Sequence, residues 1–340
     1  MKLDTTYGAA SQPPRVWDLG INVEPWDEGA FETVIATGFR YVFIDLYPWD
    51  DEEKLRRGYA QVGRFRDRLI PWSIHLPFLL NSWDFDLDAL TREYLASIEK
   101  SAPFGVKRAA IHARLWPIPE PPAAPLESTI RRNEDRVVEL LAACCRAAAV
   151  HGITIGLEND MWHEQVGMWL ATAPDLVRLV ERIGEPNVGV CLDANHASGS
   201  GVNPGRFIRE AGSRLVDTHL NDTFGYFQGR SIAECDMHLP PGVGAINWCE
   251  VLDALHAIEY PNPVVFEVDP AALVSEGWPS DQQNAYPYRM TYAEWVRLCY
   301  QNWRTMELAR WAWEHVPKWQ GAEMGKRHGL SADPQALARG

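Results

Sequence analysis

The chain has 340 residues, 46% of them hydrophobic, and a formal net charge of −14. This length fits one α/β barrel with extensions, and the apolar fraction suffices for a large core. The negative charge argues against a nucleic-acid surface built from broad basic patches, although it leaves room for a local one.

Cysteine usage and the distribution of apolar residues indicate the compartment. The six cysteines include no C-x-x-C spacing, so buried thiols in a reducing cytosol are the simplest interpretation. Residues 1–15 lack an apolar run, and no segment approaches the apolar length of a membrane span. We therefore expect a cytoplasmic protein without a signal peptide and without a membrane partner.

Strand-like and helix-like segments alternate along the chain after a polar, turn-rich arm at residues 1–15. Strands are predicted at 16–23, 41–46, 69–76, 108–113, 153–158, 188–193, 215–222 and 263–269. Helices are predicted at 27–36, 51–66, 86–100, 128–150, from 174, at 204–211, at 246–258 and at 291–315. Ser128 is the predicted cap of the helix at 128–150.

This alternation predicts a parallel sheet, and eight units favour a closed barrel over an open doubly wound sheet. No Gly-x-Gly-x-x-Gly follows the first strand, so a dinucleotide site has no support. The predicted fold is therefore an α/β protein, a (β/α)8 TIM barrel at 16–290, with a C-terminal helical extension and a polar tail at 291–340.

The predicted strands end in side chains that can bind metals. Along 188–193, bulky apolar residues alternate with small ones, and the face with the small residues ends in the carboxylate of Asp193. A barrel strand has this pattern when helices cover its outside and its inner end opens into a site. Five other strands end in a similar group: His75, His112, Glu158, His219 and Glu267.

Four of these groups would converge at the carboxyl ends of the last four strands: Glu158, Asp193, His219 and Glu267. Three carboxylates and one imidazole suit Mn²⁺, Mg²⁺ or Co²⁺ better than a thiolate-preferring ion. Without a cation the neighbouring carboxylates would repel one another and take up protons. Any one of them alone could equally make a strand-end salt bridge, but four at matching positions favour a shared cation.

Several motifs resemble those of the xylose-isomerase-like TIM-barrel superfamily over roughly residues 16–270. They are Leu157-Glu-Asn159, Cys191-Leu-Asp-Ala-Asn-His196, His219-Leu-Asn-Asp222, His238-Leu-Pro-Pro-Gly-Val-Gly244 and Phe266-Glu267. This superfamily groups sugar isomerases and epimerases with the endonuclease IV type of apurinic-site endonuclease. The motifs are specific for the superfamily and weak for the reaction.

The epimerase branch implies one divalent ion, with Mn²⁺ as the first expectation and Mg²⁺, Co²⁺ or Zn²⁺ as alternatives. The resemblance implies that Glu158 and Glu267 act as acid and base on a sugar, with a metal-stabilised enediolate between two proton transfers. It implies that the ion is held by Glu158, Asp193, His219 and Glu267. Substrate-binding roles are expected for His196, His75, His112, His238, Trp116 and Trp162.

Two other activities fit the same resemblance. A large subunit of a lyase that deglycosylates 3-keto C-glycosides would use the same metal and base, and it would need a small partner subunit. An endonuclease IV-like phosphodiesterase would bind three Zn²⁺ through nine ligands: His75, His112, Glu158, Asp193, His196, His219, Asp236, His238 and Glu267. We rank the nuclease last because the chain is acidic, and we expect a small sugar or glycoside rather than nucleic acid as the partner. A homo-oligomer is equally compatible with the sequence.

Two further features have simpler interpretations. Gly242-Val-Gly244 resembles a phosphate-binding turn, but two glycines are a weak signal and loop geometry is the default interpretation. His256 lies inside a predicted helix, where packing is expected rather than metal binding.

Overall fold

A computed structural model describes residues 16–44, 51–77, 87–112, 126–161, 170–225, 236–269 and 291–315. Contacts divide the chain into two compact units, Trp17–Arg304 and a second that combines Met1–Val16 with Thr305–Gly340. Of the second unit, the structure describes only Val16 and residues 305–315. All strands and the candidate site lie in the first unit.

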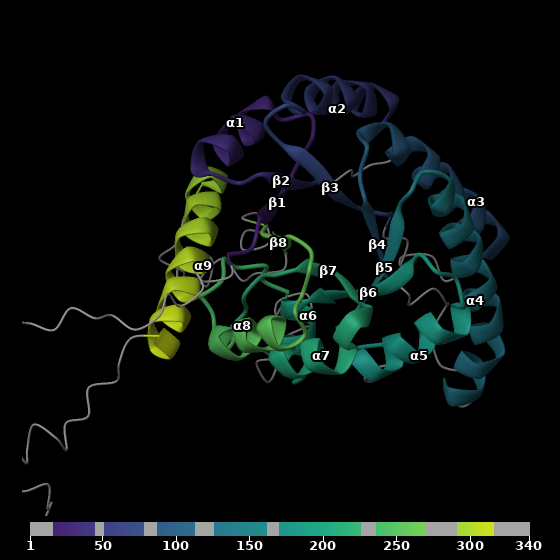
Figure 1. The fold of residues 1–340 in the computed structure, drawn as a ribbon. Helices are drawn as coiled ribbons and strands as arrows, with labels where there is room; N and C mark the ends of the chain where they lie inside the picture. The colour runs from purple at the N-terminus through teal and green to yellow at the C-terminus, as the bar shows by residue number, and fades with distance from the viewer. Residues whose placement is uncertain are drawn as a thin grey trace, which may run out of the picture. The chain divides into compact units, whose positions relative to one another are not determined.

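Eight parallel strands form a ring (Figure 1), in the order β7-β6-β5-β4-β3-β2-β1-β8. The ring closes just beyond β7, where the backbone N–H of Leu220 donates to the carbonyl of Val265 at 2.8 Å. The predicted TIM barrel is therefore confirmed. The strands are β1 (Leu19–Val23), β2 (Tyr41–Ile44), β3 (Ile70–His75), β4 (Arg108–His112), β5 (Thr154–Glu158), β6 (Val188–Asp193), β7 (Leu215–His219) and β8 (Val264–Phe266).

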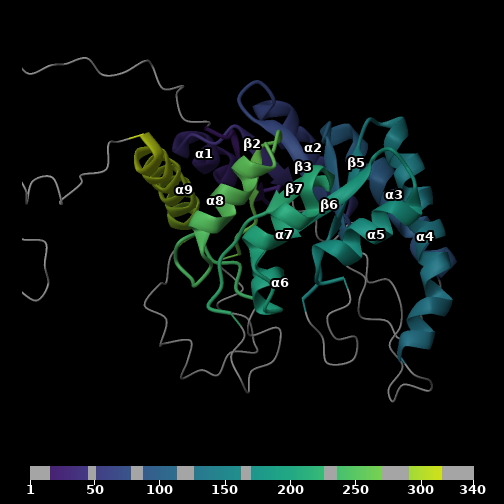
Figure 2. The same cartoon turned by 60° about the horizontal axis from the view of Figure 1, so that its bottom comes forward.

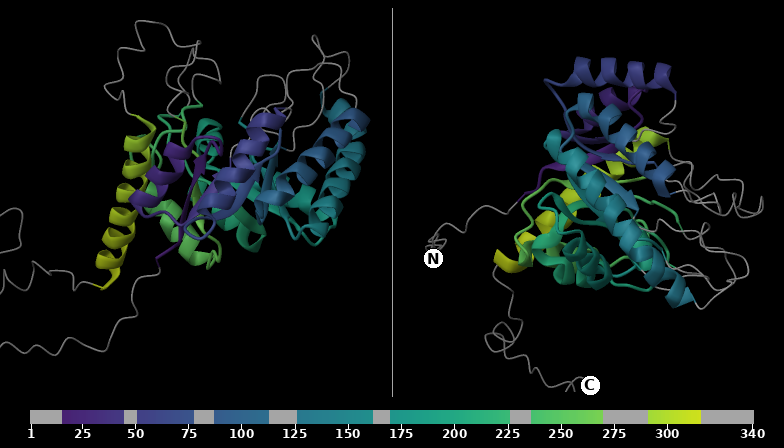
Figure 3. Two further views of the ribbon diagram at one scale, coloured as in Figure 1. Left: turned by 90° about the horizontal axis from the view of Figure 1, so that it is seen from above. Right: turned by 90° about the vertical axis from the view of Figure 1, so that its right-hand side faces the viewer.

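Helices alternate with the strands and lie outside the ring. Both views of Figure 3 show α3 and α4 running side by side. The helices are α1 (Glu28–Thr37), α2 (Glu52–Phe65), α3 (Leu87–Ser101), α4 (Leu126–Val150), α5 (Ala173–Ile183), α6 (Ala194–Gly199), α7 (Pro204–Ala211), α8 (Trp248–Ala257) and α9 (Tyr292–His315). Short 3₁₀ turns occur at Ala102–Phe104 and Gly212–Arg214.

Helix α5 shows how the sequence creates this layer. Its apolar residues recur at helical spacing and are buried, among them Leu176, Leu179 and Val180. Burying each such side chain contributes about 1.5–3 kcal/mol. Its exposed face carries Arg178, which bonds to Glu134 of α4 at 3.1 Å. The helix ends at Gly184, whose left-handed backbone suits a residue without a side chain.

Close packing inside and outside the ring depends on small residues. A Cβ atom at Gly156 of β5 would lie 3.1 Å from the Cβ of Cys191, a tight contact that would require Cys191 to shift slightly. A Cβ atom at Gly205 of α7 would lie 2.8 Å from the carbonyl of Glu250, which allows α7 to lie directly against α8. The two glycines therefore allow neighbouring elements to approach closely.

The structure differs from the sequence predictions in several places. Ser128 does not cap its helix, because α4 begins at Leu126 and Ser128 lies in its first turn. Leucine and glutamate are good helix formers, and an acidic residue favours a helix start, which explains the earlier boundary. The short helix α6, which directly follows β6 (Figure 2), was not predicted. The strands predicted at 16–23, 215–222 and 263–269 are longer than the observed β1, β7 and β8.

The predicted helix at 291–315 agrees with α9 within one residue. Within the first unit its residues Trp295 and Trp303 are buried, and the Trp303 ring lies 5.5 Å from that of Phe266 in β8. Packing is therefore the role of these two tryptophans. None of the helices in the described part of the chain has the length and apolar character needed to cross a membrane.

Candidate active site

The four predicted ligands meet at the carboxyl end of the barrel. Glu158, Asp193 and His219 are the last residues of β5, β6 and β7, and Glu267 directly follows β8. Because the strands are parallel, their carboxyl ends share one edge of the sheet. One ligand atom from each of the four side chains lies within 4.8 Å of the others. The structure thus brings the four residues together as the sequence predicted.

His219 is the centre of this group. Its Nδ1 lies 3.1 Å from Oε1 of Glu158 and 3.1 Å from Oε2 of Glu267. A ring nitrogen carries at most one hydrogen, so it cannot donate fully to both carboxylates at once. A divalent cation beside Nδ1 could contact both oxygens, and the donor set of oxygens and one imidazole fits a hard ion.

The charges of this group depend on each other. Burial alone would raise the pKa of Glu158, but the imidazoles of His219 and His112 hold it well below its usual value. Burial also acts to raise the pKa of Glu267, whereas His219 and His238 lower it to about 2. Both glutamates are therefore ionised at neutral pH, as a metal ligand or a general base must be.

Asp193 is held at the junction between β6 and α6. Its Oδ1 accepts a hydrogen bond from the backbone N–H of His196 at 2.7 Å, so Asp193 caps the short helix α6. Its Oδ2 accepts a hydrogen bond from Nδ2 of Asn221 at 2.7 Å. The side chain is fully buried. Its orientation is therefore set by the fold itself.

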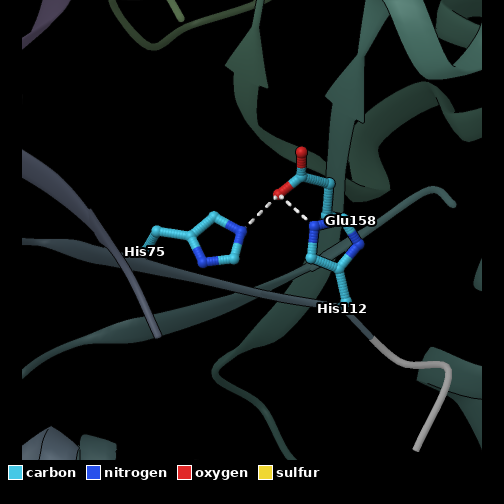
Figure 4. Close-up of side chains that lie close together, drawn as sticks. All are labelled: His75, His112 and Glu158. Carbon is cyan, nitrogen blue, oxygen red and sulfur yellow. Dashed lines mark ion pairs between the residues drawn. The ribbon is translucent and has the colours of Figure 1, made fainter. Parts of the chain in front are cut away.

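Two histidines, His75 and His112, approach the same carboxylate oxygen of Glu158, as Figure 4 shows. Nε2 of His75 lies 3.2 Å, and Nε2 of His112 lies 3.9 Å, from the same oxygen, Oε2 of Glu158. Each ring is oriented by its other nitrogen: Nδ1 of His75 contacts the carbonyl of Leu76 at 2.5 Å, and Nδ1 of His112 contacts Asp160 at 3.1 Å. Both rings therefore present Nε2 to the site.

Two further histidines, His196 and His238, lie next to the carboxylate of Asp236. Nδ1 of His196 donates to the carbonyl of Asn159 at 2.9 Å, and its Nε2 lies 3.5 Å from Asp236. Nε2 of His238 lies 2.9 Å from the same carboxylate oxygen. The four histidines for which substrate binding was predicted thus lie next to the four predicted ligands. Trp116 and Trp162, the other two predicted substrate contacts, lie outside the described residues.

Several polar residues without a predicted role also lie at this site. Asn159 and Asn221 contact Asp193, and Asp160 orients His112. A signal for them exists in the motifs, since Asn159 directly follows Glu158 and Asn221 follows His219 by two positions. Nothing in the sequence alone indicates which of their neighbours they contact.

The two simpler interpretations are confirmed. The turn at Gly242 binds a carboxylate of the chain itself, because its backbone N–H donates to Oδ2 of Asp222 at 2.8 Å. The His256 ring packs edge-on against Trp17 with centroids 4.4 Å apart.

Comparison with known proteins gives three findings. A family model described as a xylose isomerase-like TIM barrel matches residues 31–283. An uncharacterised protein of Methanocaldococcus jannaschii is 32% identical over 136 residues, which cover 39% of this chain and 43% of that protein. A D-psicose 3-epimerase of Enterocloster bolteae is 29% identical over 147 residues, which cover 42% of this chain and 44% of the epimerase. The aligned segments thus span less than half the length of these curated relatives.

Solved structures share the fold over a larger part of the chain. A structure of L-ribulose 3-epimerase aligns with a TM-score of 0.64 at 19% identity and covers 90% of this chain and 99% of that one. At this level of identity the similarity concerns the fold.

Proposed function

Since the chain belongs to the xylose isomerase-like TIM-barrel family, we propose that it is a sugar epimerase that depends on one divalent metal ion. The observation that carries this proposal is the convergence of Glu158, Asp193, His219 and Glu267, whose ligand atoms lie within 4.8 Å of one another. The similarity to a D-psicose 3-epimerase and to an L-ribulose 3-epimerase supports a keto-sugar substrate.

Proton transfer would be the work of the two glutamates. Epimerisation next to a carbonyl removes a proton from one face of a carbon atom and returns a proton to the other face. Glu158 and Glu267 come from β5 and from the end of β8 and meet at His219, so the site has one carboxylate for each step. The glutamate that removes the proton becomes a carboxylic acid. The other glutamate, which is ionised in the free site, must take up a proton from solvent before it can give one to the opposite face, and it then returns to the carboxylate form.

The cation would be held by Glu158, Asp193, His219 and Glu267. When bound, it would polarise the substrate carbonyl and offset the negative charge that develops on oxygen as the proton leaves. The surrounding imidazoles, His75, His112, His196 and His238, would position the hydroxyl groups of the sugar through hydrogen bonds.

Hydrogen exchange with solvent tests this proposal. A panel of ketoses is incubated with Mn²⁺-loaded protein in D₂O, and deuterium at the carbon next to the carbonyl is measured by NMR. We expect deuterium uptake with at least one sugar. In Glu158→Gln with bound Mn²⁺ retained, we expect a loss of about 10²–10⁴-fold in the exchange rate of the epimer whose proton Glu158 removes. Undiminished exchange into both epimers in Glu158→Gln would remove this residue from its proposed role.

A second candidate, a three-metal phosphodiesterase, is favoured by one specific observation. The described residues contain further groups suited to metals beside the central four, namely His75 with His112 and Glu158, and Asp193 with His196 and His238. Metal content separates the two functions, since an epimerase of this design needs one ion and the phosphodiesterase needs three. The remaining candidate, elimination on a 3-keto C-glycoside, shares the first proton transfer and differs in the product.

A further inference from the structure

Two buried asparagine side chains contact Asp193 from opposite sides. Asn159 directly follows β5 and Asn221 follows β7 by two residues, and both are fully buried. Strands β5 and β7 are the two neighbours of β6 in the barrel, and Asp193 is the last residue of β6. One proposed metal ligand is thus contacted from both adjacent strands.

Asn159 acts on the backbone of Asp193. Its Oδ1 accepts a hydrogen bond from the Asp193 N–H at 2.8 Å, and its Nδ2 donates to the Asp193 carbonyl at 3.0 Å. The pairing of β5 with β6 ends two residues earlier, at Glu158 and Cys191. The asparagine side chain therefore continues the pairing at the position where the backbone ladder stops, and it fixes the backbone from which the carboxylate projects.

Asn221 acts on the carboxylate itself. Its Oδ1 accepts a hydrogen bond from the backbone N–H of Asn195 at 2.8 Å. Because a backbone N–H can only donate, this bond fixes which end of the amide is the oxygen. The amino group must then face Asp193, where Nδ2 donates to Oδ2 at 2.7 Å, and it also lies 3.0 Å from Nδ1 of His238.

Together these contacts prevent Asp193 from turning. One carboxylate oxygen bonds to the His196 N–H and the other bonds to Asn221, so rotation of the carboxylate would break both bonds. Each oxygen still has a lone pair for a further partner. A side chain ordered in this way loses little rotamer freedom when a ligand binds to it.

We propose that Asn159 and Asn221 are positioning residues that hold Asp193 in the orientation in which it binds a divalent cation. This inference rests on the proposed metal-dependent function. In it, the two side-chain amides increase the affinity of the site for the cation and take no part in proton transfer. Partners that orient a metal ligand change metal affinity by about 10- to 100-fold when they are removed.

Titration of metal-free protein with Mn²⁺ alone tests this proposal. We expect Asn159→Ala and Asn221→Ala each to raise the dissociation constant about 10- to 100-fold in calorimetry. The stabilisation by Mn²⁺ in thermal unfolding should shrink accordingly, because it depends on the ratio of ion concentration to dissociation constant. Both readouts are independent of catalysis.

Asn187 offers a matched control. Its Nδ2 donates to the carbonyls of Cys145 and Ile153 at 2.7 and 3.0 Å, just before β6 begins and thus at the opposite end of that strand. Asn187→Ala also removes two amide hydrogen bonds, so it should lower the unfolding temperature. Its affinity for Mn²⁺ should stay at the wild-type value.

The outcomes separate this inference from the proposed function. Wild-type affinity in both Asn159→Ala and Asn221→Ala would overturn the positioning role while leaving the metal site intact. No Mn²⁺ binding to the wild-type protein would overturn the metal-dependent function itself, and the positioning role with it. If the alanine variants do not fold, Asn221→Leu fills a similar volume but removes the amide donor. A wild-type dissociation constant in that variant would equally overturn the inference, and a weakened one would support it.

Discussion

Nδ1 of His219 lies 3.1 Å from Oε1 of Glu158, although 61 positions separate the two residues in the chain. Burial alone would lower the pKa of His219, but its acidic neighbours, Cys191, Glu158 and Glu267, raise it well above its usual value. The metal-free imidazole is therefore protonated at neutral pH. This proton occupies the side of the ring on which we propose that a cation binds.

Metal binding is therefore expected to release a proton. A ligating imidazole must be neutral, so the cation competes with the proton on His219, and affinity should rise as the pH rises. Calorimetric titration with Mn²⁺ between pH 5.5 and 8, in buffers of different ionisation enthalpy, measures both the affinity and the protons released. An affinity independent of pH, without proton release, would contradict the competition.

Glu267→Gln separates the two proposed proton transfers. With Glu158 intact, one face of the substrate carbon still has a base, whereas the other face has lost its acid. We expect epimerisation to fall about 10²–10⁴-fold while deuterium exchange into unchanged substrate persists for the epimer served by Glu158. The measurement compares product formation with exchange in one D₂O incubation. Equal loss of the epimerisation rate and of the exchange rate for both epimers would show that the two glutamates do not act on opposite faces of the substrate carbon.

Much of this site could be predicted from the sequence, because strand ends in a parallel barrel must lie together. Once 153–158 and 188–193 are recognised as strands, the proximity of Glu158 and Asp193 follows from topology. The hydrogen bonds from Asn159 and Asn221 to Asp193 could not be predicted in this way. The bond from Asn221 depends on its amide facing Asp193 rather than solvent, and that orientation is set by the N–H of Asn195 in a helix that the sequence did not indicate.

Asp222 is expected to matter for stability although it contacts no proposed ligand. Its buried carboxylate accepts hydrogen bonds from the backbone N–H groups of Thr223, Gly242 and Ile246 and from Nε1 of Trp248. Asp222→Ala would remove the acceptor from the three buried donors, those of Thr223, Ile246 and Trp248, at about 1–3 kcal/mol each before relaxation. We expect the free energy of unfolding in urea to fall by at least about 3 kcal/mol.

Asp18→Ala is the control for this comparison. Asp18 pairs with Arg40 at 3.3 Å, but the side chain of Asp18 is 45% exposed and that of Arg40 is 64% exposed. Its removal should cost less than about 1 kcal/mol. Similar losses of unfolding free energy in Asp222→Ala and Asp18→Ala would show that the hydrogen bonds to the Asp222 carboxylate contribute little to stability.

The described cysteines should differ sharply in reactivity. Cys249 is exposed, whereas Cys144, Cys145, Cys191 and Cys299 are buried. Burial raises the pKa of Cys144 and of Cys145 to about 12, so these thiols are neutral and inaccessible at neutral pH. Alkylation of the native protein followed by peptide mass mapping should label Cys249 first and the four buried residues only after denaturation. Rapid labelling of Cys191 in the native state would contradict its place inside the barrel.

The most direct test of the proposed site is the metal content of purified, Mn²⁺-loaded protein, measured by mass spectrometry for the wild type and for His219→Ala. We predict one ion per chain in the wild type and a loss of that ion in the variant, because His219 Nδ1 lies beside both glutamates. A wild-type protein without bound divalent metal, or a variant that retains its ion undiminished, would contradict a cation shared by Glu158, Asp193, His219 and Glu267.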